Sequence, residues 1–359
     1  MTQSFFIALS GIISLISMPI IIKICQKLSL YDYQNARKIH SGNIPRLGGV
    51  GIFLATIISA IPYMIITNPD DLRKIFPILL AGTIIFVFAF VDDLLNLPAL
   101  AKLIVQLIAV SIVTFNGFRF KQIFSWQLPV PISFVLTFCW ILGVINAYNL
   151  IDGLDGLCGS FSISSIITLG VLYSLTGNSE STLCFILAAA IFGFLCFNWP
   201  PAKLFMGDAG SQFLGFMISV FPLFESNDVF EFNKFLIMIV ITAFPVFDTI
   251  AAIWRRLRDK KSIMSPDRSH LHHKLLNMGY SKTSALYLLC FLQILLCGSV
   301  VISYFLGARR GMALLLESTA FVTLFFSFVH YTNRAIILKQ KKAAKENEEE
   351  KQDNPPVVE

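Results

Sequence analysis

The chain has 359 residues, of which 55% are hydrophobic and only 14% are charged. Soluble domains carry about 25% charged residues, so this composition excludes an ordinary soluble domain and indicates a protein of the lipid bilayer. The formal net charge of +6 suits an anionic lipid surface or phosphate groups and requires no nucleic acid.

Apolar segments recur along the whole chain. A spanning helix needs about 20 mostly apolar residues, and eleven such segments are expected, at 4–23, 48–67, 76–91, 98–116, 132–148, 157–176, 181–197, 210–224, 234–254, 283–305 and 311–333. The sequence therefore predicts an all-α polytopic membrane protein with about 11 transmembrane helices. Residues 1–335 form the membrane domain, and the charged tail 336–359 is expected to be disordered.

The distribution of lysine and arginine predicts the orientation. If the N-terminus lies outside, the inner loops and the tail hold 21 of the 28 Lys and Arg residues, and the outer loops hold the remaining seven. Inner loops of membrane proteins are enriched in these residues, so the N-terminus is expected outside and the C-terminus inside. The first segment lacks a basic leader and a cleavage site, which favours a retained helix over a signal peptide. The seven cysteines form no CxxC pair, which argues against a zinc site or a disulfide framework.

Aspartates follow several of these segments on the expected inner side. A charge at the membrane is costly and usually marks a site, a pathway or an ion pair; a solvated helix end is the competing interpretation. Several carboxylates brought together need a cation between them, and hard oxygen ligands suit Mg²⁺. The aspartates are Asp92, Asp93, Asp152, Asp155 and Asp208 at segment ends, and Asp248 about two turns inside the ninth segment.

Two inner loops supply cations. The first reads NARKIHSGNIPRLGGVGIF and the second reads RRLRDKKSIMSPDRSHLHHKLL, with three of the five histidines of the chain. The histidine trio is compatible with a zinc site, with a basic membrane-facing helix, or with hydrogen-bond donors for phosphate or sugar oxygens. We favour the donors, because HxHH without a cysteine or another histidine is a weak zinc pattern.

Six motifs occur in the order found in one enzyme family. They are NARKIHSGNIPRLGG, FVDDLLNLP, NAYNLIDGLDGL, LFMGDAGSQFLG, FPVFDT and SPDRSHLHH. Over residues 35–275 the chain resembles the polyprenyl-phosphate N-acetylhexosamine-1-phosphate transferases. Its histidine motif is similar to the N-acetylglucosamine-1-phosphate branch. The alternative within the family is the phospho-MurNAc-pentapeptide translocase of peptidoglycan synthesis, which has three adjacent histidines after a proline.

The resemblance implies transfer of N-acetylglucosamine-1-phosphate, or a related N-acetylhexosamine-1-phosphate, from a UDP-sugar to undecaprenyl phosphate, with release of UMP. It implies Mg²⁺ as the cofactor, with Mn²⁺ able to substitute. It also implies a bacterial cytoplasmic membrane location with the active site facing the cytoplasm. The reaction would initiate the synthesis of O-antigen or another cell-envelope polysaccharide. Family analogy also allows a homodimer.

The resemblance assigns roles to five polar residues of the inner side. Asp208 is the implied metal ligand, and Asn149 is a second ligand by analogy with a eukaryotic relative. Asp92, Asp93 and Asp152 have implied catalytic roles, with Asp152 on the side of the metal and diphosphate. Direct attack by the lipid phosphate, with Asp92 or Asp93 accepting a proton, is favoured over a covalent aspartyl intermediate, because phosphate monoesters are largely ionised at neutral pH.

The implied substrate-binding residues come from three loops. Gly153, Leu154 and Asp155 resemble the uracil-reading part of the translocase. Phe205 matches a position that stacks on uracil, although a core position is the ordinary interpretation of a phenylalanine in a chain with 34 of them. The residues implied to hold phosphate or sugar are Lys38, Arg46, Arg268, His270, His272 and His273.

Three further features stay open or depart from the family pattern. The translocase pattern has a lysine three residues after the second aspartate, whereas this chain has Asn96 there and Lys102 is the candidate substitute. Asp248 is either a partner of the histidine loop or an ion-pair partner of Arg255 or Arg256. The outer stretch FRFKQIFSWQLPVP alternates aromatic and polar residues and is expected to form a small hairpin.

Two other classes of protein compete with the transferase. A transporter or channel would place its acids near the bilayer midplane on interrupted helices, whereas these acids lie near one interface. A CDP-alcohol phosphatidyltransferase shares an Asp-Gly pattern with DGLDG. That class needs further aspartates along the following helix, and the segment 157–176 contains none.

Overall fold

The computed structural model describes residues 2–31, 44–67, 69–262 and 269–353, which form helices, loops and one small hairpin. The helices are α1 (Thr2–Leu28), α2 (Gly48–Thr67), α3 (Pro69–Leu95), α4 (Ala99–Phe115), α5 (Val130–Ile151), α6 (Leu157–Leu175), α7 (Ser181–Asn198), α8 (Gly207–Val220), the 3₁₀ turn η1 (Phe221–Leu223), α9 (Asp228–Ile241), α10 (Ala243–Arg258), α11 (Leu271–Asn277), α12 (Lys282–Phe305) and α13 (Gly307–Asp353). The all-α class is confirmed, and the chain is a multi-pass membrane protein.

Each of the eleven expected segments overlaps a helix. Within the described ranges, eight helices are long and apolar enough to cross a membrane. Helices α4 and α8 are shorter, with 17 and 14 residues. The short length of α8 has a structural reason: its residues from Ala209 to Val220 are all buried, so this helix is surrounded by protein and need not match the bilayer thickness.

The ninth expected segment, 234–254, is not one straight helix. Helices α9 and α10 meet at Thr242 with a bend of 67°. Pro245 has no N–H to donate to the carbonyl group of Ile241, four residues earlier, and its ring opposes a continuous helix. Two buried side chains replace the missing donor, since Ser165 Oγ donates to Ile241 O at 2.8 Å and Gln293 Nε2 donates to it at 2.9 Å.

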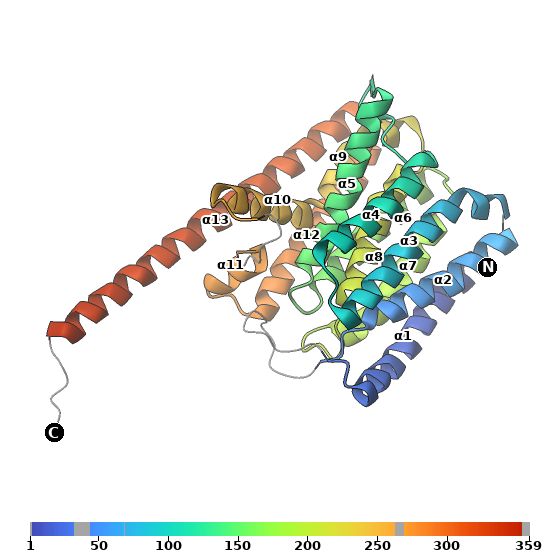
Figure 1. Ribbon diagram of the computed structural model, residues 1–359. Helices are drawn as coiled ribbons and strands as arrows, with labels where there is room; N and C mark the ends of the chain where they lie inside the picture. The colour runs from blue at the N-terminus through green and yellow to red at the C-terminus, as the bar shows by residue number, and fades with distance from the viewer. Residues whose placement is uncertain (1, 32–43, 68, 263–268, 354–359) are drawn as a thin grey trace.

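Residues 336–353, the described part of the expected tail, lie in a helix. Helix α13 continues to Asp353 and extends well beyond the bundle (Figure 1). The stretch KQKKAAKENEEEKQD is rich in alanine, lysine, glutamate and glutamine, which have high helix propensity. The low apolar content of the tail argues against packing, but it does not prevent a helix.

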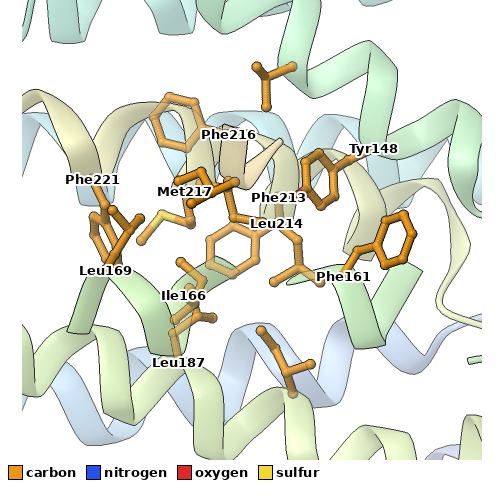
Figure 2. Packing of buried hydrophobic residues seen from close by; sticks show 14 of the residues in the cluster. Tyr148, Phe161, Ile166, Leu169, Leu187, Phe213, Leu214, Phe216, Met217 and Phe221 are labelled. Carbon is orange, nitrogen blue, oxygen red and sulfur yellow. The ribbon is translucent and has the colours of Figure 1, made fainter. Parts of the chain in front are cut away.

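Helix α8 forms the centre of the hydrophobic core. Figure 2 shows Phe213, Leu214, Phe216 and Met217 of α8 among side chains of the surrounding helices. Close packing of α8 on α5 depends on Gly215, because a Cβ atom there would lie 2.9 Å from Ile145 Cα. The core therefore fixes the position of α8, whose first turn carries one of the expected site residues.

The two ends of the bundle carry different structures. The expected hairpin is confirmed: β1 (Gln122–Ile123) and β2 (Trp126–Gln127) pair antiparallel, at the top of Figure 1. The α5–α6 and α7–α8 connections lie at the opposite, lower end, on the side toward which the tail of α13 projects. These two connections, which carry several of the expected site residues, therefore lie at the same end of the molecule.

Candidate active site

The PRLGG and FMGDAG motifs are joined through their backbones. Phe205 N donates to Pro45 O at 2.7 Å, and Gly48 N donates to Phe205 O at 2.9 Å. Gly207 completes this joint with a φ of +78°, and a Cβ atom at this position would lie less than 3.0 Å from the carbonyl oxygen of Arg46. Only glycine meets both requirements, so Gly207 allows α8 to begin directly beside Arg46.

Asp93 fixes the N-terminus of α8 from the end of α3. Its buried carboxylate accepts hydrogen bonds from Asp208 N at 3.1 Å and Ala209 N at 3.0 Å. These are two of the backbone donors that a helix N-terminus leaves unsatisfied. The Arg46 guanidinium donates to the backbone carbonyl oxygen of Asp93. Asp93 therefore determines where Asp208 lies.

Lys102 lies between two carboxylates. Its Nζ forms an ion pair with Asp92 Oδ2 and lies 3.4 Å from Asp208 Oδ2. Asp92 is buried and also accepts a hydrogen bond from Leu97 N at 2.7 Å, whereas the Lys102 and Asp208 side chains are 31% and 37% exposed. Asn96, at the position of the lysine in the translocase pattern, is exposed. The structure thus brings Lys102 to the acids, and we call Asp92, Asp93, Lys102 and Asp208 the acid cluster.

Asn149 connects the end of α5 to the same place. Its Nδ2 donates to Ser211 Oγ at 3.0 Å, and Ser211 lies one turn after Asp208 on α8. Mg²⁺ is usually held by one or two carboxylates together with substrate phosphates. The accessible Asp208 carboxylate and the nearby Asn149 amide fit this pattern. In the described ranges, no three His, Cys, Asp or Glu side chains form a metal-binding group.

The DGLDG loop is held between two other connections. Asp155 Oδ2 accepts a hydrogen bond from Ala202 N at 3.1 Å, in the α7–α8 connection. On the other side, a Cβ atom at Gly153 would lie 2.8 Å from the His272 ring. Leu154 is buried, whereas Asp152 is half-buried at the C-terminal end of α5. The close approach of Gly153 and His272 brings two of the expected substrate-binding loops together.

The histidine segment, residues 269–274, is anchored by Asp248. His270 Nδ1 lies 2.8 Å from Asp248 Oδ2, and Leu271 N donates to Asp248 Oδ1 at 2.9 Å. Of the two roles left open for Asp248, the partnership with the histidine loop is therefore confirmed. Burial lowers the pKa of His272 to about 3, so its ring is neutral at pH 7, while His273 is half-buried with its ring centroid 4.3 Å from that of His272.

The remaining expected residues have different positions. Phe205 is half-buried at the joint described above. Lys38 and Arg268 lie outside the described residues. Ser211 and Gln212 were not singled out in the sequence, although they lie three and four residues after Asp208 and helical spacing places them on its side of α8. Gln212 Oε1 accepts a hydrogen bond from Gln106 Nε2 at 3.0 Å, one turn along α4 from Lys102.

The fold and this arrangement define an integral membrane protein with acids and cations gathered at one end of a helical bundle. The family model described as glycosyl transferase family 4 matches residues 75–225, which contain the whole acid cluster. A probable undecaprenyl-phosphate N-acetylglucosaminyl 1-phosphate transferase of Bacillus subtilis (strain 168) is 33% identical over 325 residues, covering 88% of this chain and 85% of that protein. The chain belongs to glycosyl transferase family 4.

Two further relatives extend the similarity. The undecaprenyl-phosphate alpha-N-acetylglucosaminyl 1-phosphate transferase of Yersinia pestis is 31% identical over 287 residues, covering 76% of this chain and 77% of that protein. A decaprenyl-phosphate N-acetylglucosaminephosphotransferase of Mycobacterium tuberculosis (strain CDC 1551 / Oshkosh) is 30% identical over 292 residues, covering 72% of each chain. The similarity thus extends over most of the membrane domain.

Proposed function

We propose that the protein transfers N-acetylglucosamine-1-phosphate, or a related N-acetylhexosamine-1-phosphate, from a UDP-sugar to undecaprenyl phosphate and releases UMP. The names of the three relatives support this class of reaction. The observation that carries the proposal is the acid cluster, in which Lys102 contacts both Asp92 and Asp208 at one end of a membrane bundle. A lipid phosphate and a soluble nucleotide can meet only at such an interface.

The first requirement of this reaction is neutralisation of charge, because an anionic phosphate must approach an anionic diphosphate. Mg²⁺ held by Asp208 and Asn149 would neutralise the diphosphate and stabilise the leaving phosphate. The Lys102 ammonium and the Arg46 guanidinium add fixed positive charge beside the same place.

The contacts of the two neighbouring aspartates favour direct attack by the lipid phosphate. The Asp93 carboxylate is engaged by two backbone N–H groups, and the Asp92 carboxylate by Lys102 and Leu97 N. Carboxylates held in this way are suited to positioning and to charge balance. The phosphate monoester is already largely ionised at neutral pH, so the reaction needs no covalent aspartyl intermediate.

The nucleotide-sugar would bind between the DGLDG loop and the histidine segment. Asp155 and Phe205 are the candidate contacts for uracil, and His270 and His273 are the candidate donors for the diphosphate or the sugar. His272 is buried and neutral against Gly153, so we assign it to the support of this loop. In the proposed orientation this end faces the cytoplasm from the bacterial inner membrane, where the reaction would initiate synthesis of an envelope polysaccharide.

The proposal is tested by assaying UMP release from purified full-length protein with Mg²⁺, with and without undecaprenyl phosphate. UMP should appear from UDP-N-acetylglucosamine only when the lipid phosphate and Mg²⁺ are both present. A panel of UDP-N-acetylhexosamines identifies the sugar, and UDP-MurNAc-pentapeptide tests the translocase alternative. Asp208→Ala should abolish turnover, whereas Asp70→Asn, at an exposed acid of the opposite end, should not. Lipid-independent release, or no release from any donor, would contradict the proposal.

A further inference from the structure

A group of buried polar side chains inside the bundle holds the bend between α9 and α10. The carbonyl group of Ile241 cannot receive the usual helical hydrogen bond from four residues later, because that residue is Pro245. Gln293 Nε2 of α12 donates to Ile241 O at 2.9 Å, and Ser165 Oγ of α6 donates to it at 2.8 Å. Ile241, Ser165 and Gln293 are all completely buried. Two side chains from other helices therefore take the place of the missing backbone donor.

The same side chains also contact the helix that leads into the DGLDG loop. The Ser165 hydroxyl lies 3.2 Å from the Tyr148 hydroxyl and 3.3 Å from Gln293 Nε2. Tyr148 is part of the core shown in Figure 2, and it directly precedes Asn149 on α5. These contacts join α5, α6 and α12 to the α9–α10 bend, and we call Tyr148, Ser165 and Gln293 the bend network.

The energetics of Gln293 argue against a purely stabilising role. A buried amide loses its hydration, and Gln293 Oε1 has no hydrogen-bond partner among the described residues. A leucine of similar size would avoid this cost in the interior of α12, but it could not donate to Ile241 O. The contact with the bend is therefore what the amide of Gln293 contributes.

The angle of the bend determines where Asp248 lies. Helices α9 and α10 meet at 67°, and Asp248 follows Ile241 by two helical turns, about 10 Å along the axis. A change of about 10° in the bend would therefore move the Asp248 carboxylate by about 2 Å. Its contacts with His270 Nδ1 at 2.8 Å and Leu271 N at 2.9 Å would not survive such a shift.

We infer that Gln293 and Ser165 are positioning residues for the nucleotide-sugar, because they fix the angle at which Asp248 reaches the histidine segment. Both are completely buried, so they act through Asp248 and not by touching the substrate. Through the Tyr148 hydroxyl, the same contacts tie α5 and the start of the DGLDG loop to this angle. The identity of the substrate rests on the proposed function, whereas the effect on the histidine segment does not depend on turnover.

The test compares hydrogen–deuterium exchange at Leu271 in wild type and Gln293→Leu, by mass spectrometry of the full-length protein in detergent. The Leu271 N–H donates to Asp248, so its exchange reports the anchor directly. Exchange there should become about tenfold faster, which corresponds to the loss of one anchoring hydrogen bond. The melting temperature should stay near that of wild type, because Ser165 still donates to Ile241 O and the cost of burying the amide is removed.

The kinetic readout is the KM for the UDP-sugar in the UMP-release assay. In Gln293→Leu it should rise about tenfold, and kcat should change less, because the acid cluster is held by other contacts. Pro245→Ala acts on the same bend from the other side: it gives residue 245 an N–H for Ile241 O and favours a straighter helix. It should therefore produce the same two changes. The combined variant should raise the KM by less than the product of the single effects, because both substitutions act on one angle.

Asn233→Leu is the matched control. Asn233 is a buried amide in the part of α9 beside the hairpin, and its Nδ2 donates to Ala308 O at 3.1 Å. This variant should leave the exchange at Leu271 and the KM as in wild type.

Unchanged exchange at Leu271 in both Gln293→Leu and Pro245→Ala overturns the inference. It is also overturned if exchange increases while the KM stays constant, or if Asn233→Leu produces the same changes. If wild type releases no UMP from any donor, the proposed function fails, and the exchange at Leu271 alone still decides whether the bend network positions the histidine segment.

Discussion

Replacement of Lys102 by methionine tests the electrostatics of the acid cluster. Lys102→Met keeps most of the side-chain stem and removes the charge between Asp92 and Asp208. At 3.4 Å and an effective dielectric constant of about 20, the attraction between Lys102 and Asp208 is about 5 kcal/mol before solvent screening. Both side chains are about one-third exposed, which reduces this figure, whereas the contact with buried Asp92 is screened less. We expect a loss of about 2–3 kcal/mol in the free energy of unfolding, between the values for exposed and buried pairs.

The catalytic effect of Lys102→Met should be larger than its effect on stability. Removal of one preorganised charge donor typically lowers kcat about 10²–10³-fold. The assay is the initial rate of UMP release over a range of UDP-sugar and lipid concentrations. Lys121→Met is the matched control, because Lys121 forms an exposed ion pair with Glu225 at the hairpin and contributes at most about 1 kcal/mol.

A double variant separates the two effects. Asp92→Asn/Lys102→Met should recover the melting temperature, because Asp92 then no longer carries a buried charge without its partner. The kcat should not recover, because the charge of Lys102 and the positioning carboxylate of Asp92 are both missing. Near wild-type kcat in Lys102→Met, with a normal melting temperature, would refute the role given to this lysine.

Three further changes test the support of the site. Asp248→Asn should raise the KM for the UDP-sugar, because it weakens the anchor of His270 while keeping the side-chain shape; an unchanged KM contradicts this. Gly207→Ala should abolish activity, because it adds a clash to an unfavourable φ of +78°. Gly177→Ala, with a φ of +74° and open space around it, should cost only about 1–2 kcal/mol of stability. Burial lowers the pKa of His272 to about 3, from the value of 6.5 that we take for the unfolded chain. As the pH falls below 6.5, the unfolded state therefore takes up a proton on His272 and the folded state does not. The free energy of unfolding should therefore decrease toward acid pH, and His272→Gln should flatten that part of a melting-temperature profile.

The sequence predicted the elements better than their contacts. The length and the apolar composition of the segments predict helices directly, and each of the eleven segments overlaps a helix. The bend at Thr242 follows from Pro245, but the expected segment ran through this proline because its apolar residues continue on both sides. The tail helix was missed because a low apolar content excludes a packed core and not a helix of strong helix formers.

The contacts of the site depend on residues far apart in the chain. From the sequence, Lys102 was only a candidate substitute. Its contact with Asp92 depends on the turn that joins α3 to α4, and its contact with Asp208 depends on how α4 packs near α8. Neither contact can be recognised from the residues next to Lys102 in the sequence. The neutral state of His272 follows from burial against Gly153, which appears only once the DGLDG loop and the histidine segment are packed together. Motifs identify such residues, and tertiary packing decides their protonation and their partners.

The alignment of Lys102 with Asp208 is set one turn deeper in the membrane. The pair Gln106–Gln212 repeats the same spacing one helical turn along α4 and α8, and Asn146 Nδ2 on α5 donates to Gln106 Oε1 at 3.0 Å. A slide of α4 by one turn, about 5.4 Å, would separate the buried amides of Gln106 and Gln212 from each other. Because the amides oppose such a slide, the register that places the Lys102 ammonium next to Asp208 is maintained from within the bundle, and the loops at the interface need not maintain it.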